Sequence, residues 1–262
     1  MGLFDAVKAA TSGNKAYRTH VNGNELANSG KPEEAKAKYQ EALKLYEESI
    51  RLGNVAAKIL EGYAILLLRE GEFDKARDLM QRMAKMKTLT KDDWFQLRIQ
   101  YAIWEWKVGE LDKAIETIGR AADYKLNGTV YSTLGMFWVD KAKQTGDFKP
   151  ALDFNERALD YDDEDAATLD NMGQLYEAMA GAEGEGEKAA DYRAKALDFF
   201  KRAHKQKPRQ ITTLYYLARM YHQNGDDKRA RELLSIRNTL YFSAICPVTR
   251  QQMEALAQEA GC

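Results

Sequence analysis

The chain has 262 residues, 45% of them hydrophobic and 30% charged, with 4 prolines and a formal net charge of −1 at pH 7. It is therefore too apolar for a disordered chain and too charged for a membrane protein, and it has no general affinity for nucleic acid. The N-terminus lacks the apolar core of a signal peptide, and the longest strongly apolar stretch, YAILLL at 63–68, is far below the roughly 20 residues of a bilayer span. Two cysteines, Cys246 and Cys262, give no disulfide framework, so we expect a reducing, cytoplasmic location and no membrane contact.

Residues 1–15 are expected to form an N-terminal capping segment for the structure that follows. A short helix within 3–12 would place Leu3, Phe4 and Val7 on one face. The stretch is too short and too weakly basic for a membrane-surface anchor. Capping the first helix pair is therefore the favoured role.

From residue 16 to 242 one pattern recurs, in which a glycine breaks a helical pattern and an alanine follows five residues later. The glycine ends one helix, and the alanine lies in an amphipathic second helix. The pairs are Gly30–Ala35, Gly71–Ala76, Gly109–Ala114, Gly146–Ala151 and Gly225–Ala230. A further copy carries Ala196 and Phe200 and ends at Pro208, with its turn expanded into a polar, flexible lobe at 181–191.

Residues 243–262 are expected to close the array. They should contain a C-terminal capping helix over 247–260, with Pro247 near its first turn. Its apolar residues Met253, Leu256 and Ala257 would then face inward.

The spacing of the recurring alanine points to a known family. Ala35, Ala76, Ala114, Ala151, Ala196 and Ala230 are 41, 38, 37, 45 and 34 residues apart. This pattern resembles the tetratricopeptide repeat, a helix–turn–helix unit of about 34 residues. The resemblance implies an all-α fold, a right-handed solenoid of six helix pairs forming one domain over 16–242, with capping helices at both ends.

A small residue is expected midway along each first helix so that the second helix can approach closely. The alanine of the second helix would be the matching small contact, and the turn glycine would adopt a positive φ. No single pair buries its apolar faces alone, so neighbouring pairs must stack. The small residues are Gly23, Ala64, Ala102, Gly135, Gly173 and Ala218.

The side chains that usually carry chemistry are scattered along the sequence. His20, His204 and His222 fall in the first, fifth and sixth units, so they cannot share one metal ion or serve one nucleophile. Phosphate-binding motifs are absent, and the acidic run at 160–165 lacks the glycine and glutamate that an EF-hand loop needs. We expect no catalytic site, metal or cofactor, and hence a protein that is not an enzyme.

By resemblance, a partner binds in a concave groove formed by the first helices, at fixed offsets from their first conserved hydrophobic residue. Its middle part is apolar, which suggests an apolar peptide or helix as the ligand. The alternative is that an N-terminal segment or a tight superhelical turn covers this part. We expect Trp106 to line the groove and to be partly exposed. The groove residues are Tyr17, His20, Asn24, Ile65, Leu68, Arg69, Ile99, Ile103, Trp106, Lys107, Met136, Val139, Tyr215, Arg219 and His222.

These features predict a scaffold or adaptor that binds a peptide or helix of a protein partner. The alternative is a regulatory sensor that binds a small peptide and acts through a change of solenoid curvature. A chaperone C-terminus is not expected, because only Asn24 fits the carboxylate clamp of the family. Residues 147–191 hold 14 acids and 3 bases, whereas 201–237 hold 10 bases and 3 acids. This asymmetry would suit self-association, while nucleic acid is not the expected partner.

Overall fold

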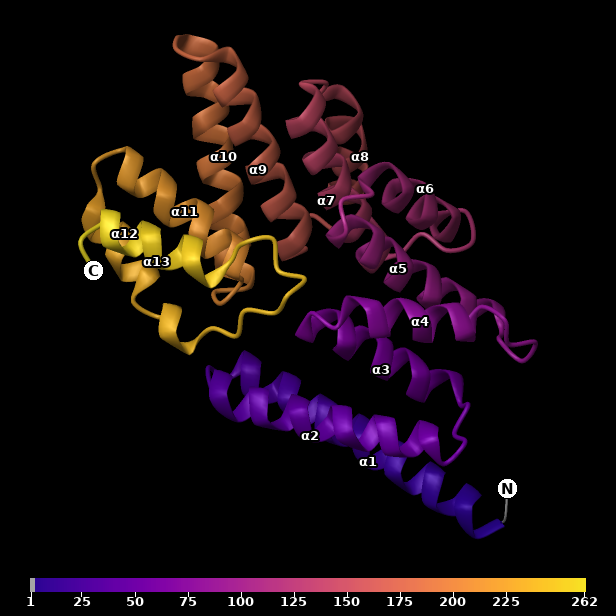
Figure 1. Ribbon diagram of the computed structural model, residues 1–262. Helices are drawn as coiled ribbons and strands as arrows, with labels where there is room; N and C mark the ends of the chain where they lie inside the picture. Colours follow the sequence, from indigo (N-terminus) through magenta and orange to yellow (C-terminus); the bar gives the residue numbers. More distant parts are fainter. Residues whose placement is uncertain (1–2) are drawn as a thin grey trace. The chain divides into compact units, whose positions relative to one another are not determined.

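A computed structural model describes the backbone of residues 3–262 and the side chains of residues 5–262. Within these residues the protein forms thirteen α-helices, one short 3-10 helix and no strand, so the expected all-α class is confirmed (Figure 1). No helix among the described residues has both the length and the hydropathy that crossing a membrane requires.

The helices divide into two compact units. Unit 1 comprises the chain up to Val108 together with Thr239–Ile245, and unit 2 comprises Gly109–Asn238 and Cys246–Cys262. The sequence pattern, which predicts one domain over 16–242, gives no sign of this division. The helices of unit 1 are α1 (Leu3–Asn28), α2 (Pro32–Arg51), α3 (Ala57–Glu70), α4 (Phe73–Met83) and α5 (Lys91–Lys107). Those of unit 2 are α6 (Leu111–Ala122), α7 (Gly128–Thr145), α8 (Lys149–Tyr161), α9 (Ala166–Glu183), α10 (Glu187–Gln206), α11 (Ile211–Gln223), α12 (Asp227–Leu234) and α13 (Arg250–Glu259), and a 3-10 helix spans Arg237–Thr239.

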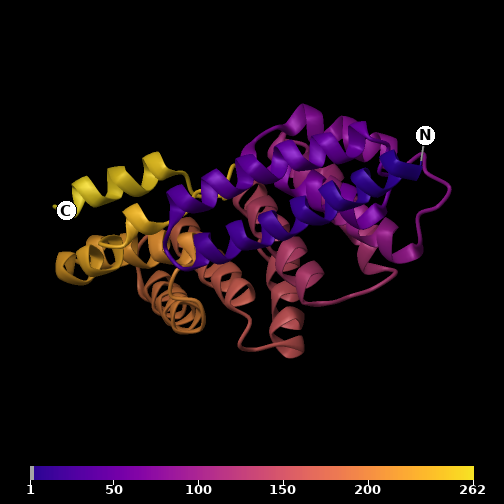
Figure 2. The ribbon, with the colours of Figure 1, turned by 90° about the horizontal axis from the view of Figure 1, so that it is seen from below.

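The N-terminal segment differs from the separate cap that the sequence suggested, because it is the first part of a continuous α1. The two helices α1 and α2 lie side by side (Figures 1 and 2). The carbonyl of Ala9 accepts hydrogen bonds from Ser49 Oγ at 2.6 Å and from Asn54 Nδ2 at 3.2 Å, which fixes the early turns of α1 on the end of α2. Val7 is 59% exposed rather than inward-facing, and the side chains of Leu3 and Phe4 lie outside the described residues.

The turn glycines and second-helix alanines behave as the repeat pattern predicts. Gly30, Gly71, Gly109, Gly146 and Gly225 adopt φ values between 74° and 88°. Gly71 and Gly146 are the left-handed residues at which α3 and α7 end. The six recurring alanines are completely buried. These local features are therefore confirmed.

Close helix approach at the small residue is also confirmed, but its partner differs from the expected alanine. A Cβ on Gly23 would lie 2.7 Å from the ring of Tyr39, and a Cβ on Gly173 would lie 2.7 Å from the ring of Phe200. Each aromatic comes four residues after the recurring alanine, one helical turn further along the same face. The absent glycine side chain therefore makes room for a large buried ring, which fills the space between the two helices.

The expanded turn of the fifth pair is mostly helix. The helix α9 continues to Glu183 and α10 begins at Glu187, so the segment 181–191 forms no separate lobe. Its alanines, glutamates and lysine favour helix, which explains the extension of both helices.

The C-terminal helix α13 starts later than the sequence suggested, after a capping box between Thr249 and Gln252. Met253, Leu256 and Ala257 are buried, as expected. The residues before it take a different course, because Thr239–Ile245 belongs to unit 1. The predicted capping segment, 243–262, is therefore divided between the two units.

Candidate functional site

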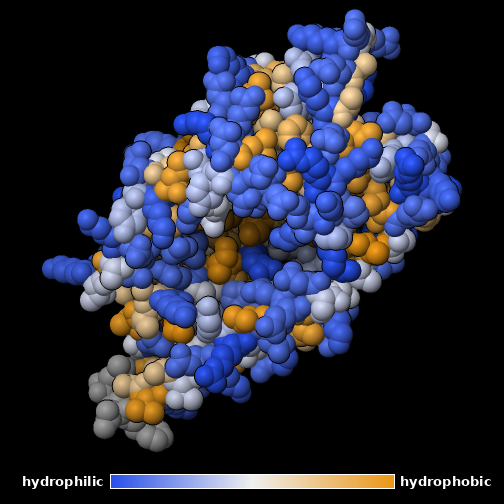
Figure 3. All heavy atoms as spheres, turned by 180° about the vertical axis from the view of Figure 1, so that it is seen from behind, coloured by the Kyte–Doolittle hydropathy of each residue, from blue (hydrophilic) through white to orange (hydrophobic). Residues whose placement is uncertain are grey.

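The apolar middle of the expected groove does not form an open surface. Leu68, Ile99 and Val139 were expected to face solvent, but they are 0%, 5% and 1% exposed. Ile65 and Ile103 are half-buried against the hydrophobic core of unit 1. These side chains fill the contact between neighbouring helices, and on the face seen in Figure 3 hydrophobic residues form scattered patches in a largely hydrophilic surface. The predicted apolar stripe is therefore largely filled by the protein's own helix packing.

The expected groove residues of α1 and α3 form an internal polar cluster. Arg69 donates hydrogen bonds to Asn24 Oδ1 at 2.6 Å and to the Tyr39 hydroxyl at 3.1 Å. His20 is buried against the Tyr39 and Tyr46 rings, at centroid distances of 5.9 and 6.2 Å. Burial and the positive charge of Arg69 lower the pKa of His20 to about 4. The side chains of this cluster thus bind one another.

Part of unit 1 next to this cluster is covered by the segment Thr239–Ile245. The Ala244 amide donates to the Arg69 carbonyl at 2.7 Å. The Tyr241 ring lies 5.0 Å from the Tyr39 ring, and its hydroxyl bonds Glu70. The sequence left open whether an N-terminal segment or a tight superhelical turn covers the groove. The covering residues 239–245 instead come from beyond the sixth helix pair.

A second half-buried polar contact in unit 1 joins α3 to α5. Gln100 Nε2 donates to the Glu61 carbonyl at 3.0 Å, and the Glu61 carboxyl hydrogen-bonds Asp93. Burial, followed by the neighbouring Asp93 charge, raises the pKa of Glu61 to about 7. The fold therefore favours the protonated form of the Glu61 carboxyl. Two other expected groove residues of unit 1 are also half-buried. Tyr17 lies beneath Lys58, and Trp106 has the Lys107 ammonium 4.8 Å from its ring centroid.

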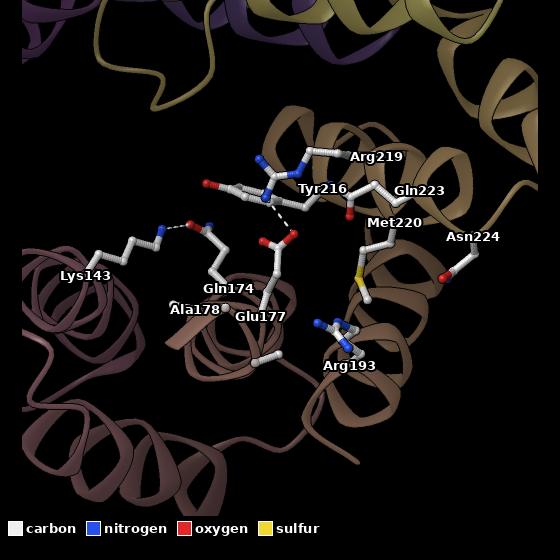
Figure 4. A pocket seen from close by; sticks show the side chains of 12 residues that line it. Lys143, Gln174, Glu177, Ala178, Arg193, Tyr216, Arg219, Met220, Gln223 and Asn224 are labelled. Atoms are coloured by element: carbon white, nitrogen blue, oxygen red, sulfur yellow. Dashed lines mark hydrogen bonds and ion pairs between the residues drawn. The ribbon is translucent and has the colours of Figure 1, made fainter. Parts of the chain in front are cut away.

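Unit 2 contains an open pocket of about 500 Å³ (Figure 4). Its walls come from α7, α9, α10 and α11, so three of its four helices are the first members of their pairs. A second pocket of about 220 Å³ shares Gln174 with it. The main polar residues of the larger pocket are Lys143, Gln174, Glu177, Arg193, Tyr216 and Arg219.

A series of hydrogen bonds runs from this pocket into the interior of unit 2. Lys143 Nζ donates to Gln174 Oε1 at 2.7 Å, and Gln174 Nε2 donates to Asp170 Oδ2 at 2.8 Å. Thr213 Oγ1 donates to the other Asp170 oxygen at 2.6 Å. Burial raises the pKa of Asp170, although the hydrogen bonds from Thr213 and Gln174 favour its charged form. The Lys143 and Gln174 side chains are thereby held in fixed positions.

Arg219 provides the opposite wall of the pocket. Its Nη2 lies 2.6 Å from Glu177 Oε1, and its guanidinium lies 4.7 Å from the Tyr216 ring centroid and 5.4 Å from that of Tyr215. Stacking on tyrosine and the ion pair fix the plane of the guanidinium. Its Nε is buried and has no hydrogen-bond partner. The arginine is therefore preorganised, and its buried Nε–H has no acceptor.

Some of the expected groove residues lie at these pockets, and others do not. Arg219 lines the larger pocket, Tyr215 contacts Arg219, and Met136 lines the smaller pocket. His222 instead hydrogen-bonds Asp227 at 2.6 Å. In the fifth unit the groove positions lie two residues before Leu169 and one, five, eight and nine residues after it. They are Ala167, Asp170, Gln174, Glu177 and Ala178, and each lines one of the pockets. Lys143 and Arg193 lie outside those offsets, so only the structure identifies them.

Comparison with known proteins supports the repeat assignment. Residues 21–88 match the family model of the tetratricopeptide repeat. A search of curated proteins finds no match. Among solved structures, a human IFIT1 dimer with PPP-AAAA aligns with a TM-score of 0.59 at 19% identity, over 76% of this protein and 45% of the IFIT1 chain.

Two further structures are similar to this protein. The APC/C hetero-tetramer Cut9–Hcn1 gives a TM-score of 0.58 at 17% identity, over 98% of this protein and 47% of the matched one. TTC0263, a thermophilic TPR protein of Thermus thermophilus, gives a TM-score of 0.51 at 17% identity, over 63% of this protein and 80% of TTC0263. The chain spans less than half the length of the IFIT1 and Cut9–Hcn1 chains. At these identities the likeness establishes the fold, an all-α solenoid. The family match covers residues 21–88, and the turn glycines and buried alanines repeat the same local geometry in the later helix pairs.

Proposed function

We propose that this protein is a non-enzymatic scaffold that binds a short extended segment of a protein partner in the larger pocket of unit 2. The observation that carries the proposal is the arrangement of charged side chains around that pocket, from Asp170 through Gln174 to Lys143 and from Glu177 to Arg219. Burying charged groups lowers stability relative to apolar packing of similar shape. Stacking of repeats needs only small and apolar contacts, so these charges indicate a binding role.

The dimensions and chemistry of the pocket favour a peptide segment over a docked helix. A volume of about 500 Å³ is in the range of small-ligand sites and holds a few residues. Gln174, Gln223 and Asn224 supply amide donors and acceptors, which suit a peptide backbone. Tyr216 and Met220 add apolar surface for a side chain.

A pull-down from the cytosol of the source cells tests this proposal. The full-length protein serves as bait in wild-type form and as Lys143→Ala and Gln174→Ala, with quantitative mass spectrometry of the captured proteins. Arg18→Ala, an exposed change on α1, is the matched control. We expect the wild type and the control to capture one protein in stoichiometric amount. Either pocket variant should capture at least about tenfold less of that protein. Capture that is unchanged in both pocket variants would contradict the proposal.

A further inference from the structure

The pocket of unit 2 collects positive charge from three separate helices. Lys143 comes from α7, Arg193 from α10 and Arg219 from α11, and their side chains point toward one hollow (Figure 4). Glu177 is the one carboxylate among the described lining residues. We propose that this pocket selects a single carboxylate group of the partner segment, bound by Arg219 and Lys143 with Arg193 at the rim; this inference rests on the function proposed above.

The donors at the site exceed the acceptors that the protein supplies. Arg219 uses Nη2 for Glu177, while its Nε is buried and unpaired. A buried N–H without an acceptor is unfavourable, and a charged acceptor forms the strongest hydrogen bond to a guanidinium. Because Glu177 already orients the guanidinium, its positive charge is held at the pocket wall, where a ligand carboxylate would be attracted.

Lys143 shows the same shortage of negative charge. Its ammonium donates to the neutral oxygen of Gln174 and lies 3.8 Å from Asp140. Burial lowers the pKa of Lys143 despite the nearby carboxylates of Asp140, Glu177 and Asp170. The surrounding groups therefore offset the partial loss of hydration of the ammonium incompletely, and a carboxylate in the pocket would stabilise its charge.

The charge around the pocket suits one negative charge rather than several. Lys143, Arg193 and Arg219 contribute three positive charges, and Glu177 and Asp140 contribute two negative ones. The surplus of positive charge is therefore at most one. Asp170 is left out of this count because it lies behind Gln174. One carboxylate would neutralise this surplus, whereas a polyanion such as nucleic acid would exceed it.

The carboxylate can come from the C-terminus of a polypeptide or from the side group of an Asp or Glu, and three acetylated hexapeptides distinguish these sources. GAGAGA with a free C-terminus has one terminal carboxylate, GAEAGA with an amidated C-terminus has one glutamate carboxylate, and amidated GAQAGA has neither. Each is titrated into the full-length ¹⁵N-labelled protein while the Nε–Hε signal of Arg219 is followed by NMR. We expect at least one acidic peptide to shift this signal and to bind at least about tenfold more tightly than the glutamine peptide.

Variants assign the binding to the pocket. Arg219→Gln and Lys143→Gln should each weaken binding of the acidic peptide by about tenfold or more. Lys201→Gln, an exposed change on α10, should leave binding unchanged. Thermal melts confirm that each variant is folded. Equal binding of the three peptides, no shift of the Arg219 signal with any of them, or tighter binding of PPP-AAAA at the same arginine would overturn the inference. If the pull-down still depends on Lys143 and Gln174 in that case, the proposed function stands and only the carboxylate assignment fails.

Discussion

The two units carry the same repeat but present different surfaces on their first helices. In unit 1 the predicted groove positions are occupied by the protein itself: Leu68 and Ile99 are buried, and Arg69 is bound to Asn24. In unit 2 the corresponding helices surround an open polar pocket in which Arg219 keeps an unpaired donor. The repeat thus fixes how helices pack, while the residues at the groove offsets decide whether a face is closed or can bind a ligand.

The shared part of the two units is the close approach at glycine, and breaking it should have the largest effect. Gly23→Ala in unit 1 and Gly173→Ala in unit 2 would each place a Cβ 2.7 Å from a buried ring. We expect each to lower the free energy of unfolding by about 2–3 kcal/mol, measured by urea denaturation followed by circular dichroism. Gly119→Ala is the control, because nothing lies within 4 Å of its Cβ and alanine favours helix. Equal stability of Gly173→Ala and Gly119→Ala would contradict the packing described here.

The closed cluster of unit 1 should respond to acid. Because the pKa of His20 is lowered to about 4, the unfolded chain takes up the proton first as pH falls below 6.5. The free energy of unfolding should therefore fall by about 2 kcal/mol between pH 6.5 and 4 because of His20. Trp94, Trp104 and Trp106 make tryptophan fluorescence a suitable probe of urea unfolding in unit 1. His20→Gln should remove this dependence, and an unchanged pH profile in the variant would show that His20 is not the group responsible.

Glu61 should give a smaller change of opposite sign. Its pKa is raised to about 7 from 4.5, so the folded protein binds the proton more tightly than the unfolded chain. The resulting stability is fully present below pH 4.5 and is lost as pH rises through 7. Since the side chain is half-buried, we expect Glu61 to change the free energy of unfolding by about 1 kcal/mol over this range. Glu61→Gln should flatten the profile in this range by the same fluorescence assay, whereas an equally steep profile would contradict the raised pKa of Glu61.

Features that depend on a few neighbouring residues were predictable from the sequence. The turn glycines, the buried alanines and the inward face of α13 follow from local helix geometry, and all are observed. The pocket was partly predictable, because Asp170, Gln174 and Glu177 occupy the same offsets in the fifth unit that were applied to the other units. Their acidic and amide side chains, rather than the apolar stripe, mark the open site.

Features set by distant parts of the sequence were not predictable. The covering of unit 1 depends on Tyr241 and Glu70, which are 171 residues apart in sequence. The burial of Leu68 and Val139 depends on how closely the next helix packs, which the offsets do not specify. The role of Trp106 in binding stays a prediction, since it is half-buried at the end of α5.

Site-specific photo-crosslinking tests most directly whether the partner binds in unit 2. Benzoylphenylalanine is placed at Gln223, which lines the pocket, or at Gln96, an exposed groove position on α5 of unit 1. Each full-length protein is irradiated in the cytosol of the source cells, and adducts are identified by mass spectrometry. We expect one dominant adduct from Gln223 that disappears when Lys143→Gln is added, and no adduct of that partner from Gln96. An adduct from Gln96 alone, or one from Gln223 that survives Lys143→Gln, would contradict it.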